Sequence, residues 1–321
     1  MQWPTLGRWA LGIWLILKIG PVFSANWLFL ADREVAPLEA ALRNAYRTPA
    51  LPVAFSLPDS ATTLRGFLAT ERPASRRALD SLDALANFCG RQQIDVVVAW
   101  GGEAIQAARR RCASPALLAG MTREQFAPLL AAHRATPVSA IYLEADPLLD
   151  LRLARVLLPK AHHVGVLVPA SVPAWLASLR AEARRLDLAL VEIVAADDLD
   201  AVRALRPRLA SLDVVLLPPE SNLVSAWSLK PLLLMTIRQG IPVLGGASTR
   251  YVEAGVLAAV VADEERLPAQ MQSLIADLAR GRTPSPAYPA AVQVVVNPAV
   301  AQTLGISAEA IQRAHSLFSS P

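Results

Sequence analysis

The chain has 321 residues, of which 54% are hydrophobic and 18% charged, and its formal net charge is +4. This length exceeds what one typical hydrophobic core organises, so two lobes of ordinary domain size are expected. The 25 prolines are scattered, and no disordered, low-complexity or solenoid segment is indicated. The basic residues lie on expected helices rather than beside clustered aromatic residues, which argues against binding to nucleic acid.

Residues 1–25 predict a secretory signal peptide, and therefore export. Arg8 supplies the positive charge, residues 10–17 an apolar core, and Ser24 or Ala25 the expected cleavage position. Lys18 interrupts the apolar stretch, which is shorter than the roughly 20 residues that a membrane span needs. An uncleaved N-terminal anchor is the alternative. Cleavage would remove Arg8 and Lys18 but no acid, and so lower the net charge from +4 to +2.

The remaining chain alternates short β-rich runs with amphipathic helical runs. Several strand candidates, such as 94–99 and 213–217, are apolar throughout, which is typical of parallel sheets covered by helices on both faces. The fold class is therefore α/β, with two doubly wound sheets as the natural partition. The expected strands are 27–31, 52–56, 94–99, 116–119, 139–143, 164–168, 188–194, 213–217, 241–244, 256–262 and 292–296.

Residues that directly follow these strands are the candidate ligand-binding residues. In doubly wound sheets, ligands bind beyond the carboxyl ends of the strands, where helix N-termini and loop amides converge. Asp32 follows one strand, and glycine pairs follow two others. The residues that we expect to bind ligand are Gly101, Gly102, Glu103, Glu220, Ser248, Thr249 and Arg250.

The stretch from Gly245 to Arg250 carries the sharpest of these expectations. A glycine pair lets the backbone approach a ligand, and a polar first helical turn favours an anion. Arg250 from one lobe and Glu103 from the other could hold the carboxylate and ammonium groups of an amino-acid-like solute. The alternative is that the glycines only end a strand, while Ser248 or Thr249 caps a helix.

Catalytic and cofactor-binding motifs are absent from the sequence. It contains no nucleophile elbow, no phosphate-binding loop and no zinc-binding spacing of histidines or cysteines. The chain is therefore expected to bind a small molecule without turning it over, with no metal or cofactor. Cys89 and Cys112 are the only cysteines and are expected at the same edge of one sheet. In an oxidising compartment they predict a disulfide, with two buried free thiols as the alternative.

The second half of the chain resembles a known family. "DVVLLPPESNLVS" followed by "GIPVLGGASTRYVEAGVLAAV", the entry "ARVLLPKAHHVGVLV" and the ending "VQVVVNPAVAQTLGIS" are similar to the periplasmic substrate-binding proteins of bacterial ABC transporters, specifically the tryptophan- and tyrosine-type family. The match is dense from about residue 146 onward. Before that, the sequence departs from the family: Gly101-Gly102-Glu103 stands where a glycine followed by Thr or Ser is common.

The resemblance implies the type I periplasmic-binding fold, in which two Rossmann-like lobes hold a solute in the cleft between them. Residues 26–139 and 256–282 are then expected in the first lobe, and 140–255 and 283–321 in the second. The implied function is capture of a small solute for an ABC transporter permease. A periplasmic sensor that keeps the fold but reports to a receptor rather than a permease is the alternative.

Overall fold

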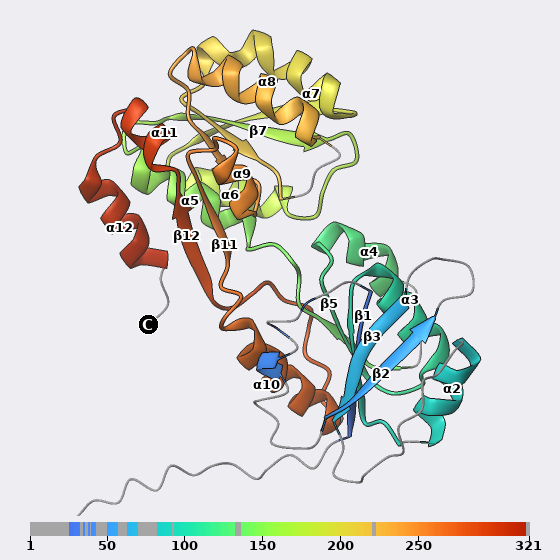
Figure 1. Ribbon diagram of the computed structural model, residues 1–321. Helices are drawn as coiled ribbons and strands as arrows, with labels where there is room; N and C mark the ends of the chain where they lie inside the picture. The colour runs from blue at the N-terminus through green and yellow to red at the C-terminus, as the bar shows by residue number, and fades with distance from the viewer. Residues whose placement is uncertain are drawn as a thin grey trace, which may run out of the picture.

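The structure is a computed structural model that describes residues 26–32, 35, 38, 40–42, 50–56, 63–69, 82–91, 93–131, 136–219 and 223–318. The expected signal peptide and Glu220 lie outside these residues. Figure 1 shows two α/β lobes, each built around its own sheet. No helix in the described part of the chain is both long and apolar enough to cross a membrane.

The first sheet has the strand order β2-β3-β1-β4-β5-β6. Strand β1 runs parallel to β4, as do β4 to β5 and β5 to β6, whereas β3 is antiparallel to both β1 and β2. The central strands are buried along most of their length, which explains their unbroken apolar sequences. The strands are β1 (Trp27–Ala31), β2 (Ala50–Ser56), β3 (Thr63–Ala69), β4 (Val96–Trp100), β5 (Ala116–Ala119) and β6 (Val138–Ala140).

Helices cover both faces of this sheet, and alternate residues of each strand face opposite layers. Leu28 and Val97 pack in a core with α2 (Leu82–Arg91), α3 (Gly102–Arg111) and α4 (Arg123–Ala131). Trp27 and Val96 face the other way, toward α10 (Leu267–Ala279). Cys89 of α2 and Cys112 at the end of α3 are joined by a disulfide, with their Cα atoms 5.5 Å apart.

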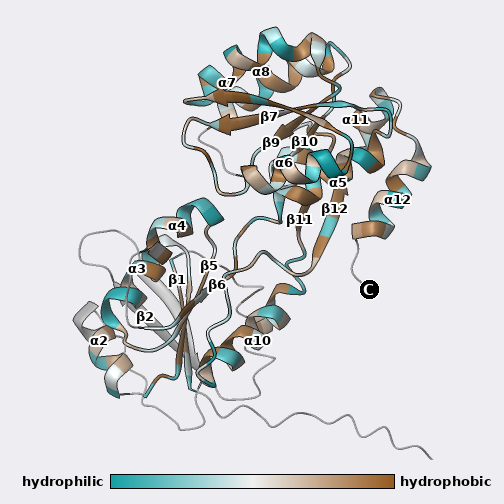
Figure 2. Ribbon diagram, turned by 180° about the vertical axis from the view of Figure 1, so that it is seen from behind, coloured by the Kyte–Doolittle hydropathy of each residue, from teal (hydrophilic) through white to brown (hydrophobic). Residues whose placement is uncertain are grey.

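The second sheet has the order β12-β11-β10-β9-β7-β8, and only the edge strand β12 runs antiparallel to its neighbour. Figure 2 shows its apolar strands between helices whose outer faces are more polar. The strands are β7 (His163–Pro169), β8 (Ala189–Ala195), β9 (Val214–Leu217), β10 (Val243–Gly245), β11 (Ala258–Ala262) and β12 (Val292–Val296).

Two helical layers cover this second sheet. One contains α5 (Pro147–Leu157), α6 (Leu176–Arg185), α11 (Pro298–Thr303) and α12 (Ala308–Phe318). The other contains α7 (Asp198–Leu205), the short 3-10 helix η1 (Arg206–Ser211) and α8 (Ala226–Ile237). Helix α9 (Thr249–Glu253) follows β10 at the carboxyl edge of the sheet.

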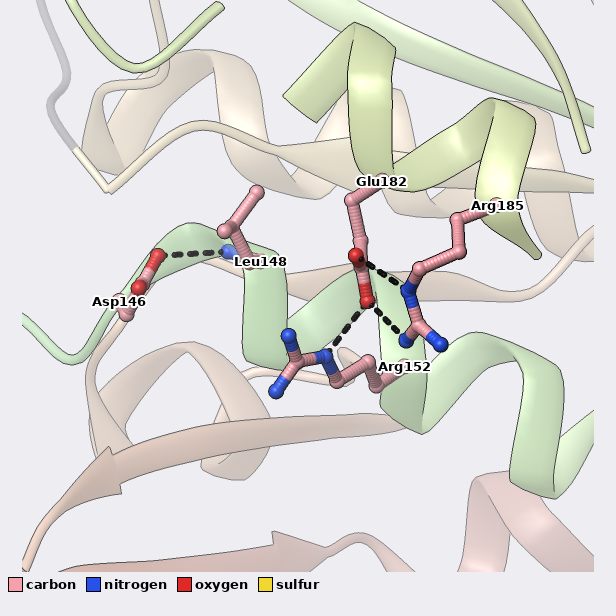
Figure 3. A network of polar contacts seen from close by, with 5 residues as sticks. All are labelled: Asp146, Leu148, Arg152, Glu182 and Arg185. Carbon is pink, nitrogen blue, oxygen red and sulfur yellow. Dashed lines mark hydrogen bonds and ion pairs between the residues drawn. The ribbon is translucent and has the colours of Figure 1, made fainter. Parts of the chain in front are cut away.

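An ion cluster around the buried Glu182 carboxylate links α5 to α6 through Arg152 (Figure 3). The Glu182 carboxylate accepts hydrogen bonds from Arg185 at 2.6 and 2.8 Å and from Arg152 at 2.6 Å. The hydrogen bonds from Arg185 and then Arg152 lower the pKa of Glu182 to about 2. At the start of α5, the Asp146 carboxylate accepts a hydrogen bond from the backbone of Leu148. The Arg152–Glu182 bond therefore joins the two helices.

The described chain passes between the lobes three times: after β6, between β11 and α10, and between α10 and β12. The expected first-lobe segment 256–282 is therefore divided. Strand β11 belongs to the second sheet, because it pairs with β10 on one side and β12 on the other. Only α10 packs on the first sheet. The expected boundary at 256 is wrong by the length of one strand.

Candidate functional site

The carboxyl edge of the first sheet carries an acidic group directly on the N-terminus of α3. The Asp32 carboxylate, just after β1, accepts a hydrogen bond of 2.9 Å from the backbone N–H of Glu103. Gly101 has a φ of +92°, and a Cβ there would lie 2.0 Å from an Asp32 oxygen. Glycine is required at this turn because the carboxylate fills the space that a side chain would need.

This arrangement changes the expected chemistry of the first-lobe residues. The helix amide that an anionic ligand would use already binds a carboxylate of the protein itself. Glu103 is exposed and Gly102 is half-buried. With Asp32 and Glu103 side by side, this edge suits a cationic group. Asp32 is therefore a candidate that our list omits, although its position directly after a strand was a usable signal.

At the carboxyl edge of the second sheet, the glycine pair has a structural role. Gly245 and Gly246 have φ values of +90° and +86°. A Cβ on Gly245 would lie 2.8 Å from the backbone oxygen of Leu217, and one on Gly246 would lie 2.9 Å from the ring of Tyr251. These close approaches are to the protein's own atoms, so the pair is explained by local packing.

Ser248 caps α9, since its hydroxyl accepts a hydrogen bond from the Arg250 backbone N–H at 3.3 Å. This is the helix-cap alternative of the sequence analysis, and it leaves Ser248 half-buried. Thr249 and Arg250 are exposed. Among the described residues, the Arg250 guanidinium makes no ion pair, so it is available to an anion at this edge.

A pocket of about 650 Å³ lies at the carboxyl ends of β4 and β5, beside the segments that connect the lobes. Its wall includes the Trp100 indole, which packs so closely on Gly120 that a Cβ there would lie 2.7 Å from the indole nitrogen. Gly101, Glu103 and Arg250 are not among the described residues that line it. The lining residues are Val35, Leu38, Ala41, Trp100, Ala119, Gly120, Ile141, Tyr142, Leu143, Ala262, Glu264, Glu265, Leu267 and Pro289.

A cluster of Arg123, Tyr142 and Tyr288 adjoins this pocket, which Tyr142 helps to line. The Arg123 guanidinium donates a hydrogen bond of 3.1 Å to the Tyr288 hydroxyl and lies about 6 Å from the ring centres of Tyr288 and Tyr142. The two tyrosine rings meet edge to face, with centroids 5.0 Å apart. Burial raises the pKa of Tyr288 to about 12, so its hydroxyl stays protonated. The cluster joins α4 to two of the connecting segments.

A buried acid links the glycine loop of the second lobe to strand β11. Asp150 lies in the first turn of α5 and is 8% exposed. Its carboxyl accepts a hydrogen bond of 2.8 Å from the Val260 backbone and lies next to Gly245. Strand β10 ends at Gly245, so the sheet offers the Val260 amide no partner on that side. Burial raises the pKa of Asp150 to about 7.

In the described part of the chain, no three or more His, Cys, Asp or Glu side chains gather in a way that could hold a metal ion. The site residues therefore offer recognition groups: an acidic edge on one lobe, a basic side chain on the other, and an apolar pocket with two aromatic walls beside the connecting segments.

Comparison with known proteins identifies the family of this chain. A family model described as ABC transporter substrate binding protein matches residues 74–314. Among curated proteins there is no significant match. Solved structures are similar in fold. A ligand-free, open substrate-binding protein with adhesive properties from Clostridium difficile, CD0873, is 18% identical, with 88% of this chain and 96% of that one covered and a TM-score of 0.59.

Two further structures have the same fold. A conserved domain protein from Vibrio cholerae is 18% identical over 91% of this chain and 98% of its own, with a TM-score of 0.53. An "ABC domain in complex with L-Trp" from Streptococcus pneumonia is 18% identical over 75% and 88%, with a TM-score of 0.51. The two lobes have the type I periplasmic-binding architecture. With three quarters of its length matched by the family model, the chain belongs to the ABC transporter substrate-binding protein family.

Proposed function

We propose that this protein is a periplasmic solute-binding protein that captures a small molecule for an ABC transporter and does not transform it. The observation that carries the proposal is the pocket of about 650 Å³ beside the connecting segments, at the carboxyl ends of β4 and β5. Carboxyl ends of strands are where ligands bind in sheets of this kind. The volume falls within the usual range for small-molecule sites.

The pocket lining, together with charged residues that lie outside it at the two sheet edges, favours a ligand with an apolar body and opposite charges. Trp100 and Tyr142 offer aromatic faces, and most other lining residues are apolar. Asp32 and Glu103 give the first lobe an acidic edge, while Arg250 gives the second lobe an exposed guanidinium. An amino-acid-like zwitterion satisfies all three. L-Tryptophan, the ligand named for the Streptococcus pneumonia structure, is the first compound to test.

Binding is tested by titration calorimetry with L-tryptophan, followed by mass spectrometry of small molecules released from gently purified protein. If Arg250 holds the ligand carboxylate, Arg250→Ala should weaken binding about tenfold or more, because charge-assisted bidentate contacts are strong. Glu103→Gln should weaken it less, since Asp32 remains nearby. Arg238→Ala removes an exposed arginine at the C-terminal end of α8 and should leave affinity unchanged.

The outcomes separate the parts of this proposal. Absence of binding by L-tryptophan and of any released small molecule would reject solute capture. Binding that tolerates both Arg250→Ala and Glu103→Gln would reject these side chains as ligand contacts but keep the function. Binding lost on Trp100→Ala would place the ligand against the pocket wall.

A further inference from the structure

One hydrogen bond joins the two lobes outside the three connecting segments. The backbone N–H of Ala174, just before α6 in the second lobe, donates to the Glu124 carboxylate in the first turn of α4 at 3.2 Å. Figure 1 shows α4 on the side of the first lobe that is turned toward the second. The contact thus joins the two layers whose separation sets how wide the cleft opens.

Hydrogen bonds fix the residues on either side of Glu124. Its neighbour Arg123 donates its backbone N–H to Glu144 at 2.8 Å and its guanidinium to Tyr288. The backbone N–H of Thr122 is bound by the side chain of Gln125 at 3.1 Å. The first turn of α4, which carries Glu124, is therefore fixed to the connecting segments.

The receiving amide belongs to Ala174, in the turn that leads into α6. Trp175 occupies the N-cap position of α6 and contributes no side-chain hydrogen bond. The exposed amides of a helix start carry partial positive charge, and a carboxylate nearby is stabilising. Glu182 of α6 in turn accepts a hydrogen bond from Arg152 of α5, so the segment that Glu124 binds is connected to the neighbouring helix of the layer.

We propose that Glu124 is a positioning residue that restrains the opening of the lobes by binding the Ala174 backbone, just before α6, across the cleft. The restraint is a bond between two groups of the protein itself and therefore goes beyond solute capture. Its role differs from that of a ligand contact: it limits how far apart the two edges of the cleft stand before a solute arrives.

The test measures the distance between the lobes without ligand. Spin labels are attached at Gln106→Cys on α3 and Arg203→Cys on α7, two exposed positions in different lobes, with the native disulfide intact. Double electron–electron resonance then gives the distance distribution. Glu124→Ala should shift it to longer distances and broaden it. A charge-assisted hydrogen bond of ordinary strength corresponds to a roughly tenfold change in the ratio of restrained to open molecules.

Two further variants separate positioning from folding. Glu124→Gln keeps an acceptor oxygen without the charge, so its distribution should lie between those of the parent and Glu124→Ala. Glu309→Ala removes a carboxylate from the first turn of α12, which lies within one lobe, and should leave the distribution unchanged. Thermal unfolding should be similar for the parent and the two Glu124 variants. If Glu124→Ala gives the parent distribution while folded, or if Glu309→Ala shifts it equally, the inference is overturned.

Discussion

At the scale of single residues, two adjacent glycines at the start of α3 have different roles. Gly101 has a φ of +92° and faces the Asp32 carboxylate, whereas a Cβ on Gly102 would meet only the Met121 sulfur at 4.0 Å. Gly101→Ala should therefore lower the free energy of unfolding by roughly 1–3 kcal/mol. Gly102→Ala should leave it unchanged or raise it by up to about 1 kcal/mol.

Urea denaturation of both variants checks this pair. Equal losses in the two would mean that the turn is sensitive to any side chain, rather than to the conformation and contact of Gly101. Because both variants leave Glu103 in place, ligand binding can be followed in the same samples.

Asp150 predicts a pH dependence of stability. Burial raises its pKa from 3.8 to about 7, so the folded state holds this proton more tightly than the unfolded state. The stabilisation from this group is fully present below about pH 4 and is lost as the pH rises through about 7, at a slope of up to about 1.4 kcal/mol per pH unit.

Asp150→Asn cannot ionise, yet it keeps an oxygen for the Val260 amide. The variant should therefore gain stability relative to the parent as the pH rises from about 5 to 8. Urea denaturation at a series of pH values measures the difference. Parallel curves for parent and variant across this window would show that Asp150 stays charged.

At the scale of elements, the disulfide between Cys89 and Cys112 ties the helix before β4 to the helix after it. Loss of a bridge that closes a loop of this length costs on the order of 3 kcal/mol. The double variant Cys89→Ala, Cys112→Ala should unfold at a correspondingly lower urea concentration. Denatured but unreduced parent protein should react with no thiol reagent; labelling of both cysteines would contradict the bond.

Element positions follow from the sequence where local pattern and tertiary role agree. Strands expected at 27–31, 116–119 and 292–296 coincide with β1, β5 and β12. Strand β3 was missed, since Arg65 and Gly66 interrupt its apolar run and its antiparallel place beside β1 depends on distant pairing. The assignment of β11 to the wrong lobe has a similar cause: periodicity predicts a strand but not its sheet.

For the candidate site too, the sequence predicts only the part that follows from local pattern and topology. Strand ends identify Gly101 to Glu103 and Ser248 to Arg250 as edge residues, because that inference needs only the topology. The large pocket was not foreseen, since its walls come from segments spread between Val35 and Pro289. The inter-lobe bond of Glu124 was also missed, because nothing local distinguishes this glutamate from a solvated one.

At the scale of the whole molecule, the proposed periplasmic role requires export. The order of positive charge, apolar core and small residues in 1–25 predicts cleavage close to Ser24 or Ala25. N-terminal sequencing of protein from the periplasmic fraction should therefore begin at Ala25 or Asn26. Membrane-bound protein that retains Met1 would instead support the uncleaved anchor.

The position of helix α10 in the chain affects the order in which the molecule can fold. It supplies Met271, Ile275 and Leu278 to the core of a lobe whose strands all precede residue 141. Domains often finish folding in the order of their synthesis. Here one face of the first sheet is covered only in part, by residues such as Leu42, until most of the chain has left the ribosome, so a nascent chain lacking α10 displays an apolar surface that chaperones can bind.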